Sequence, residues 1–191
     1  PIPIAFWAAM EVTGDYACDS PLGYRYMRVA ISSDDAHEKG GVVDRENHTL
    51  KMGWDDNAWT GVRFRNVYIP QNARILEAKI VFTAQAAEPT GGWGGSSGGD
   101  SGTVNYHITA HDVDNSPTFQ AVNYDISDRI PKTSHIVWNI TNTWYIWEKY
   151  NTPDLKDIVQ TIIDRPGWEK GNAMTFMLQR IGTGKRRAWS F

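Results

Sequence analysis

The sequence predicts an all-β fold, an antiparallel β-sandwich of jelly-roll type with one amphipathic helix at about residues 153–165. Segments that alternate apolar and polar residues recur along the chain, turn-forming residues separate them, and only one segment has helical periodicity. With 191 residues, of which 41% are hydrophobic, the chain can bury one core. We therefore expect a sandwich domain at 24–191, preceded by an N-terminal extension at 1–23 that can pair with an open sheet edge.

The strand predictions follow from the alternation of side chains. Residues 24–33 alternate aromatic or aliphatic residues with polar ones, and residues 61–69 place Val62 and Phe64 on the opposite parity to Arg63. The same reasoning predicts strands at 49–54, 74–85, 103–111, 135–140, 173–180 and 186–191. The Gly-rich segment 91–102 is predicted to be a loop.

The helix prediction rests on an apolar stripe and on signals at both ends. Thr152 can cap the helix, while Pro153 and Asp154 suit its first turn. The sequence RPG at 165–167 ends it. The stripe has the spacing i, i+3, i+4, i+7 and i+8 and consists of Leu155, Ile158, Val159, Ile162 and Ile163.

Composition and charge exclude several partners. The 19 basic and 22 acidic residues are interspersed and give a net charge of −3, so no broad positive field is present to hold nucleic acid. No apolar run is long enough to span a membrane, and the single cysteine, Cys18, cannot form an internal disulfide. Nine tryptophans, eight tyrosines and Gly/Ser-rich loops are typical of secreted β-domains that bind through exposed aromatic rings. We expect a secreted or cell-surface protein.

Several short motifs occur in a characteristic order. The first is SSDDAHE at 32–38, and GVRF at 61–64, AKIVFT at 78–83, DNSPTF at 114–119, TPDL at 152–155, RPGW at 165–168 and GTGKR at 182–186 follow it. Their order resembles a family of secreted, mostly bacterial β-domains that begin with S-S-D-D-A-E-E. His37 departs from that pattern, and the family continues past the position of Phe191 into one more apolar strand. The pattern is also similar to calcium-bearing, carbohydrate-binding jelly rolls.

This resemblance implies a calcium ion near residues 32–38, because Ca²⁺ takes six to eight oxygen ligands. Asp34 and Asp35 point to opposite faces of a strand, so only one of them can join a given site without a bulge. The candidate ligands are Asp34, Asp35, Glu38, Asp55, Asp56, Asp112 and Asp114. The alternative is that these are solvated carboxylates and turn residues.

Histidines offer a weaker metal hypothesis. His107 and His111 share a strand face, but four residues at about 3.3 Å each place them about 13 Å apart, too far to chelate one ion without a bulge. Histidines from separate strands can still converge.

The candidate ligand-binding residues combine flat rings, which stack on sugars, with arginines, which bind carboxylate or sulfate in bidentate fashion. They are Trp59, Trp93, Trp144, Tyr145, Arg186 and Arg187. Core packing of the rings and strand-edge salt bridges of the arginines are the alternatives.

The sequence contains none of the G-x-S-x-G, H-E-x-x-H, phosphate-loop or dinucleotide motifs, so we expect no enzyme activity. We expect a calcium-stabilised, non-catalytic module that binds carbohydrate or an extracellular-matrix component. One alternative is a structural or adhesive subunit of an extracellular assembly, which self-associates. A second is a surface metal-binding protein.

Overall fold

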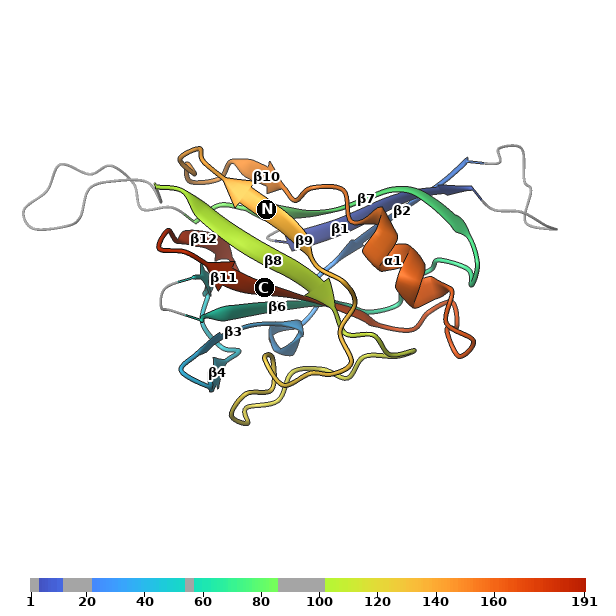
Figure 1. Ribbon diagram of the computed structural model, residues 1–191, viewed down its shortest axis with the longest axis horizontal. Helices are drawn as coiled ribbons and strands as arrows, with labels where there is room; N and C mark the ends of the chain where they lie inside the picture. The colour runs from blue at the N-terminus through green and yellow to red at the C-terminus, as the bar shows by residue number, and fades with distance from the viewer. Residues whose placement is uncertain (1–3, 12–21, 54–56, 86–101) are drawn as a thin grey trace, which may run out of the picture.

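The computed structural model of the chain describes residues 4–11, 22–53, 57–85 and 102–191. Two antiparallel sheets form a sandwich, and one helix lies at one end of it (Figure 1). The predicted all-β fold with a single helix is confirmed.

One sheet has four strands, in the order β10 (Lys149–Asn151), β7 (Arg74–Thr83), β1 (Ile4–Glu11) and β2 (Leu22–Arg28). The other has six, in the order β4 (Val42–Asp44), β3 (Asp35–Lys39), β6 (Trp59–Phe64), β11 (Met174–Ile181), β8 (Val104–Ala110) and β9 (Ile136–Ile140). A 3₁₀ turn, η1 (Ser32–Asp34), leads into β3.

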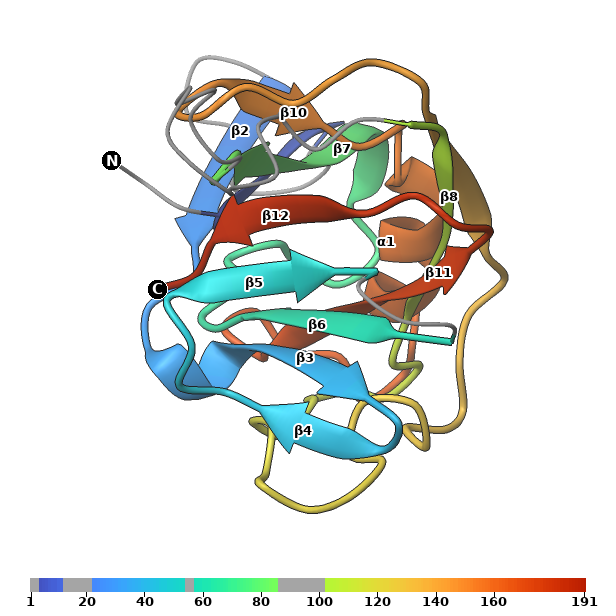
Figure 2. The ribbon, with the colours of Figure 1, turned by 90° about the vertical axis from the view of Figure 1, so that its left-hand side faces the viewer.

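A two-stranded sheet of β12 (Arg186–Trp189) and β5 (Thr49–Met52) lies between the two larger sheets on the side away from the helix (Figure 2). An isolated bridge between Ala84 and Ala188 ties β12 to the chain that continues from β7. The pair therefore extends the four-stranded sheet along that side.

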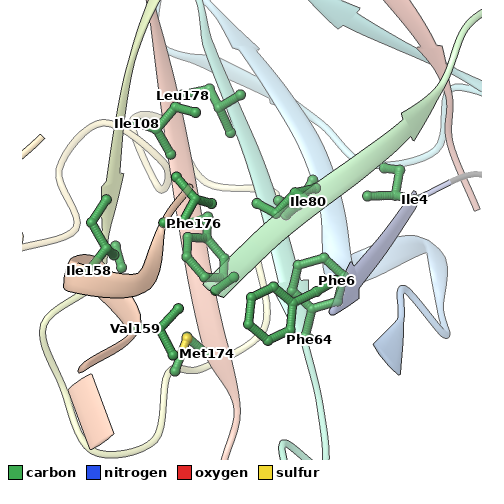
Figure 3. Packing of buried hydrophobic residues seen from close by; sticks show 14 of the residues in the cluster. Ile4, Phe6, Phe64, Ile80, Ile108, Ile158, Val159, Met174, Phe176 and Leu178 are labelled. Carbon is green, nitrogen blue, oxygen red and sulfur yellow. The ribbon is translucent and has the colours of Figure 1, made fainter. Parts of the chain in front are cut away.

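Residues 4–11, which we expected in an extension, form an inner strand between β7 and β2. The inner side chains of β1, Ile4, Phe6, Ala8 and Met10, are fully buried. The Phe6 ring lies 5.4 Å from that of Phe64 and 5.5 Å from that of Phe176 across the sandwich. Figure 3 shows this packing from both sheets. The sandwich therefore includes β1. Every second residue of β1 is apolar, and these side chains fill part of the core.

The helix α1 (Lys156–Ile163) buries the predicted stripe, with Ile158, Val159, Ile162 and Ile163 all in the core. Thr152 does not cap it. The Thr152 hydroxyl instead accepts a hydrogen bond from the backbone N–H of Ile80 in β7, at 3.0 Å. The Asp154 carboxylate accepts from the N–H of Lys156, at 3.0 Å, and from that of Ala78. The helix begins later than predicted because the residues before it pair with β7.

A smaller apolar cluster lies on the outer face of the six-stranded sheet, where part of the segment 111–134 covers it. The cluster consists of Ala36, Phe119, Ile126 and Met177. The Phe119 ring sits over Gly61 of β6, and a Cβ at Gly61 would lie 2.3 Å from its ring carbon Cζ. This close approach explains why a glycine occupies the middle of β6.

Candidate functional site

Asp34, the first calcium candidate, is fully buried and ion-paired. Arg63 donates from Nη1 to Oδ1 of Asp34 at 2.6 Å, and Arg65 Nε lies 3.0 Å from Oδ2. The Thr118 hydroxyl also donates to Oδ1, at 3.1 Å. Two guanidinium groups already compensate the charge of this carboxylate, so a divalent cation at the same oxygens would meet two positive neighbours.

Glu38 caps a turn. Its Oε2 accepts hydrogen bonds from the backbone N–H groups of Ile126 and Ser127, at 3.0 and 2.9 Å. This contact anchors the covering segment to β3, because Glu38 is itself buried. The geometry gives Glu38 a structural role.

Asp112 and Asp114 converge on one arginine. Arg165, just after the helix, donates from Nη1 to Asp112 at 2.7 Å and from Nε to Asp114 at 2.6 Å. The two aspartates therefore join the helix end to the loop after β8. The structure brings these two candidates together, but around a cation that the protein itself supplies.

Asp35 differs from the other carboxylates. It is buried on the inner face of β3, and its Oδ2 accepts a hydrogen bond from the backbone N–H of Phe191 at 2.9 Å. The buried Oδ1 has no hydrogen-bond partner within the described chain. Burial raises the pKa of Asp35 to about 7, although the Phe191 and Ser190 hydrogen bonds oppose the shift.

The candidate carboxylates that the structure describes are not gathered into one cation site. Among the residues that the structure describes, no group of three or more His, Cys, Asp or Glu side chains is placed to hold a metal ion. Asp34, Glu38, Asp112 and Asp114 are engaged by arginines or backbone N–H groups. Asp55 and Asp56 lie outside the described residues, so calcium binding stays a prediction.

Two of the predicted ligand-binding residues are fully buried. Trp144 packs in the core and stacks on Tyr150, with ring centroids 4.5 Å apart. Arg186 donates to the carbonyl oxygens of Lys185, Gly102 and Asn142, at 2.7 to 2.8 Å. Their expected contact with a ligand is therefore corrected. The Trp144 ring fills space in the core, and the Arg186 guanidinium binds backbone carbonyl groups of the loops next to β12.

The other predicted ligand-binding residues have mixed positions. Tyr145 is exposed, at 62%, and Arg187 is half-buried on the outer side of β12. Trp59 is half-buried and packs against the small apolar cluster, with Lys132 Nζ 5.4 Å from its ring centroid. Trp93 lies outside the described residues.

A group of rings that the sequence did not single out lies on the outer face of the four-stranded sheet. Tyr24 and Tyr26 of β2 are 70% and 58% exposed. Trp7 of β1 is paired directly with Tyr26, and Ala9 with Tyr24. Because paired residues share a face, the half-buried Trp7 lies on the same face as the exposed Tyr24 and Tyr26, and we call these three rings the aromatic face.

Small and charged residues surround the aromatic face. Ala5 and Ala9 flank Trp7 along β1, so neither side chain rises above the ring. Lys79 of β7 pairs with Trp7, its Nζ lies 5.7 Å from the indole centroid, and it forms an ion pair with Glu77 at 2.5 Å. The aromatic face is therefore an apolar platform with charged groups on its β7 side.

A second aromatic pair lies near the bridge between β7 and β12. Trp147 is 52% exposed and stacks on Trp189, with ring centroids 4.8 Å apart. Trp147 has a φ of +68°, a left-handed conformation that is uncommon for an aromatic residue. Hydrogen bonds between its N–H and the carbonyl of Ala84, and between Ala84 N–H and the carbonyl of Glu148, hold the turn against β7.

The signal for the aromatic face was present in the sequence. Tyr24 and Tyr26 share one parity of a predicted strand, and Trp7 shares the odd parity of the first apolar segment. The pairing of these segments joins Trp7 to Tyr26, which lies 19 positions later, and this register could not be deduced from either segment alone.

No described helix is long and apolar enough to cross a membrane. Comparison with protein-family models, curated proteins and solved structures returns no match for the chain. The family resemblance therefore stays a prediction that rests on its quoted motifs.

Proposed function

We propose that the protein is a secreted, non-catalytic module that binds carbohydrate on its aromatic face. The observation that carries this proposal is the juxtaposition of Trp7 with Tyr26, beside Tyr24, on the exposed face of a sheet. Flat aromatic rings stack on the apolar faces of sugar rings. Exposed rings of this kind are unfavourable in water and add little to the stability of the fold, so they indicate an interaction site.

The position of the rings on strands favours binding. Trp7 and Tyr26 belong to neighbouring strands with continuous pairing, so the backbone that carries them is already ordered before a ligand arrives. Less conformational entropy is then lost on association. Lys79 and Glu77 supply a donor and an acceptor at the edge of the platform for sugar hydroxyls.

The ligand that fits best is an extended chain rather than a single sugar. Trp7 is level with Lys79 of β7, whereas the Trp147–Trp189 pair lies near Ala84 of the same strand path. Five residues of extended chain correspond to about 17 Å. A polysaccharide that follows β7 would therefore meet two groups of aromatic rings.

The test is a glycan array probed with the wild-type protein, with Tyr26→Ala and with Tyr68→Ala. Tyr68 is a matched control, since it is 53% exposed and lies in the connection between β6 and β7 rather than on β1 or β2. We expect polysaccharide binding that Tyr26→Ala weakens and Tyr68→Ala preserves. Absence of binding to any glycan, or equal binding by all three proteins, would contradict the proposal.

Calcium enters the same experiment as a separate arm. If the predicted calcium stabilisation is correct, a chelator lowers the melting temperature of the purified protein and added Ca²⁺ restores it. Magnesium serves as the control ion, because its smaller octahedral site differs from that of calcium. An unchanged melting temperature would contradict calcium stabilisation, but it would not bear on sugar binding by the aromatic face.

The second candidate function is a subunit of an extracellular assembly. It is favoured by β2, which is the outer strand of its sheet among the described residues and carries both exposed tyrosines. An edge strand can pair with a strand of another copy. Light scattering after size-exclusion chromatography distinguishes the two: a monomer that binds glycans supports the module, and a polymer that Tyr26→Ala dissociates supports the assembly.

A further inference from the structure

Two histidines from separate strands meet on the outer face of the six-stranded sheet, far along the chain from each other. His107 lies in β8 and His135 immediately precedes β9. Their rings are nearly parallel, with centroids 4.1 Å apart and an interplanar angle of 20°. We propose that His107 and His135 form a two-imidazole site for a divalent transition-metal ion such as Ni²⁺, Cu²⁺ or Zn²⁺.

The strand register creates this pair. His107 is paired with Val137, and His135 lies two residues before Val137, on the same side of β9 and diagonal to His107. The sequence spacing of the two histidines carries no such signal. Only the antiparallel pairing of β8 with β9 brings the rings together.

The rings are available to an ion. In the part of the chain that the structure describes, neither His107 nor His135 forms a hydrogen bond or ion pair through its ring. The contrast is with His111, which is buried and shares a 2.9 Å hydrogen bond between Nδ1 and the Ser116 hydroxyl, and with His37, which lies 3.7 Å from Asp44.

The two rings are close enough for one ion to bind both after one ring turns. A metal–imidazole bond is about 2.0–2.1 Å long and lies in the plane of the ring, so two nitrogens on one ion lie roughly 3 Å apart. Because the stacked ring planes are tilted by only 20°, the His135 ring leaves the stack by rotating about its side-chain bonds, and both nitrogens then face one ion. His135 is exposed and stands at the start of its strand, where such a rotation displaces no core residue.

The surroundings leave room for the other ligands of the ion. A cavity of about 210 Å³ adjoins His135, and Thr133, Ser134, Asp157 and Thr161 are among its lining residues. Water molecules bound to the ion can hydrogen-bond to these polar groups. Imidazole prefers Cu²⁺, Ni²⁺ and Zn²⁺ to Ca²⁺ and Mg²⁺, so this site is chemically distinct from the predicted calcium site.

The experiment is isothermal titration of Ni²⁺ and of Zn²⁺ into the untagged protein at neutral pH. The variants are His107→Gln and His135→Gln, and His48→Gln is the matched control because His48 is exposed and lies outside the pair. We expect one ion per chain in the wild type and in the control. Each single variant at the pair should weaken binding of the ion by at least ten-fold, because it removes one of the two imidazole ligands.

Retention of the wild-type affinity by both variants, or the absence of binding to the wild type, would overturn the proposal. A second readout protects the result from changes in folding. The variants should keep the wild-type melting temperature without metal, and only the wild type and the His48 variant should gain stability when Ni²⁺ is added.

Discussion

The guanidinium group of Arg63 donates a 2.6 Å hydrogen bond to the fully buried carboxylate of Asp34. Arg65 approaches the second carboxylate oxygen to 3.0 Å. Asp34 belongs to the motif that predicts calcium, but in the structure it forms an internal ion-paired cluster with the two arginines. This cluster joins η1 to the end of β6. An ion pair this deep is costly to break, because the remaining charges stay buried.

Asp34→Asn should lower the free energy of unfolding by about 3–5 kcal/mol, since it leaves two arginines without their anion. Urea denaturation measures the loss. Asp128→Asn is the control, because Asp128 is exposed and should change stability by less than about 0.5 kcal/mol. Equal stability of the two variants would contradict the role given to Asp34.

Gly61→Ala should destabilise the protein by about 1–3 kcal/mol, because the new methyl group would overlap the Phe119 ring. The double variant Gly61→Ala with Phe119→Leu should recover part of the loss, since the smaller side chain vacates the space. A double-mutant cycle gives the coupling free energy between the two positions. Strictly additive losses would show that the ring does not pack on this glycine.

Ile162→Ala should cost about 2–5 kcal/mol of unfolding free energy, as the side chain is fully buried between α1 and the sheets. Thr161→Ala, one residue earlier on the exposed side of the helix, should cost far less. Chemical denaturation of both variants tests whether the helix stabilises the sandwich through its apolar stripe. Similar losses at the two positions would refute that assignment.

Asp35 should make stability depend on pH in a defined direction. Burial raises its folded-state pKa to about 7 from the ordinary value of 3.8, so the folded protein binds the proton more tightly than the unfolded chain. This contribution is complete below about pH 4 and is lost as the pH rises through about 7.

Asp35→Asn should remove the fall in stability that Asp35 causes as the pH rises, because the asparagine side chain stays neutral at every pH. The stability of the variant relative to the wild type should therefore increase from pH 5 to pH 8, as measured by urea denaturation across that range. The histidines contribute equally to both proteins and cancel in this difference. A difference that is constant with pH would show that Asp35 does not titrate near neutrality.

The sequence was sufficient to predict elements whose local pattern matches their burial. The helix was predicted because Ile158, Val159, Ile162 and Ile163 are both periodic and buried. Strand β7, Arg74–Thr83, was also predicted, at nearly its observed length. Strand β3 was missed because its buried residues include Asp35, His37 and Glu38. A segment with so many charged or polar residues lacks the apolar alternation by which a buried strand is predicted.

The candidate sites were harder to predict because they depend on contacts between distant segments. Arg63 looked like an outward residue of a half-exposed strand, yet its partner Asp34 lies 29 residues earlier. Arg186 looked like a surface cation and is fully buried. In the sequence, His107 was considered with His111 on one strand face, but only the register of β8 with β9 places His107 beside His135.

The most direct test of the central claim is the affinity of the protein for the polysaccharide that it binds best on the array, measured by isothermal titration. The comparison is between the wild type, Tyr24→Ala with Tyr26→Ala, and Tyr68→Ala. Stacking contributes about 0.5–1.5 kcal/mol per ring, so the double variant should bind at least about five-fold more weakly while Tyr68→Ala binds normally. An unchanged affinity in the folded double variant would contradict carbohydrate binding by the aromatic face.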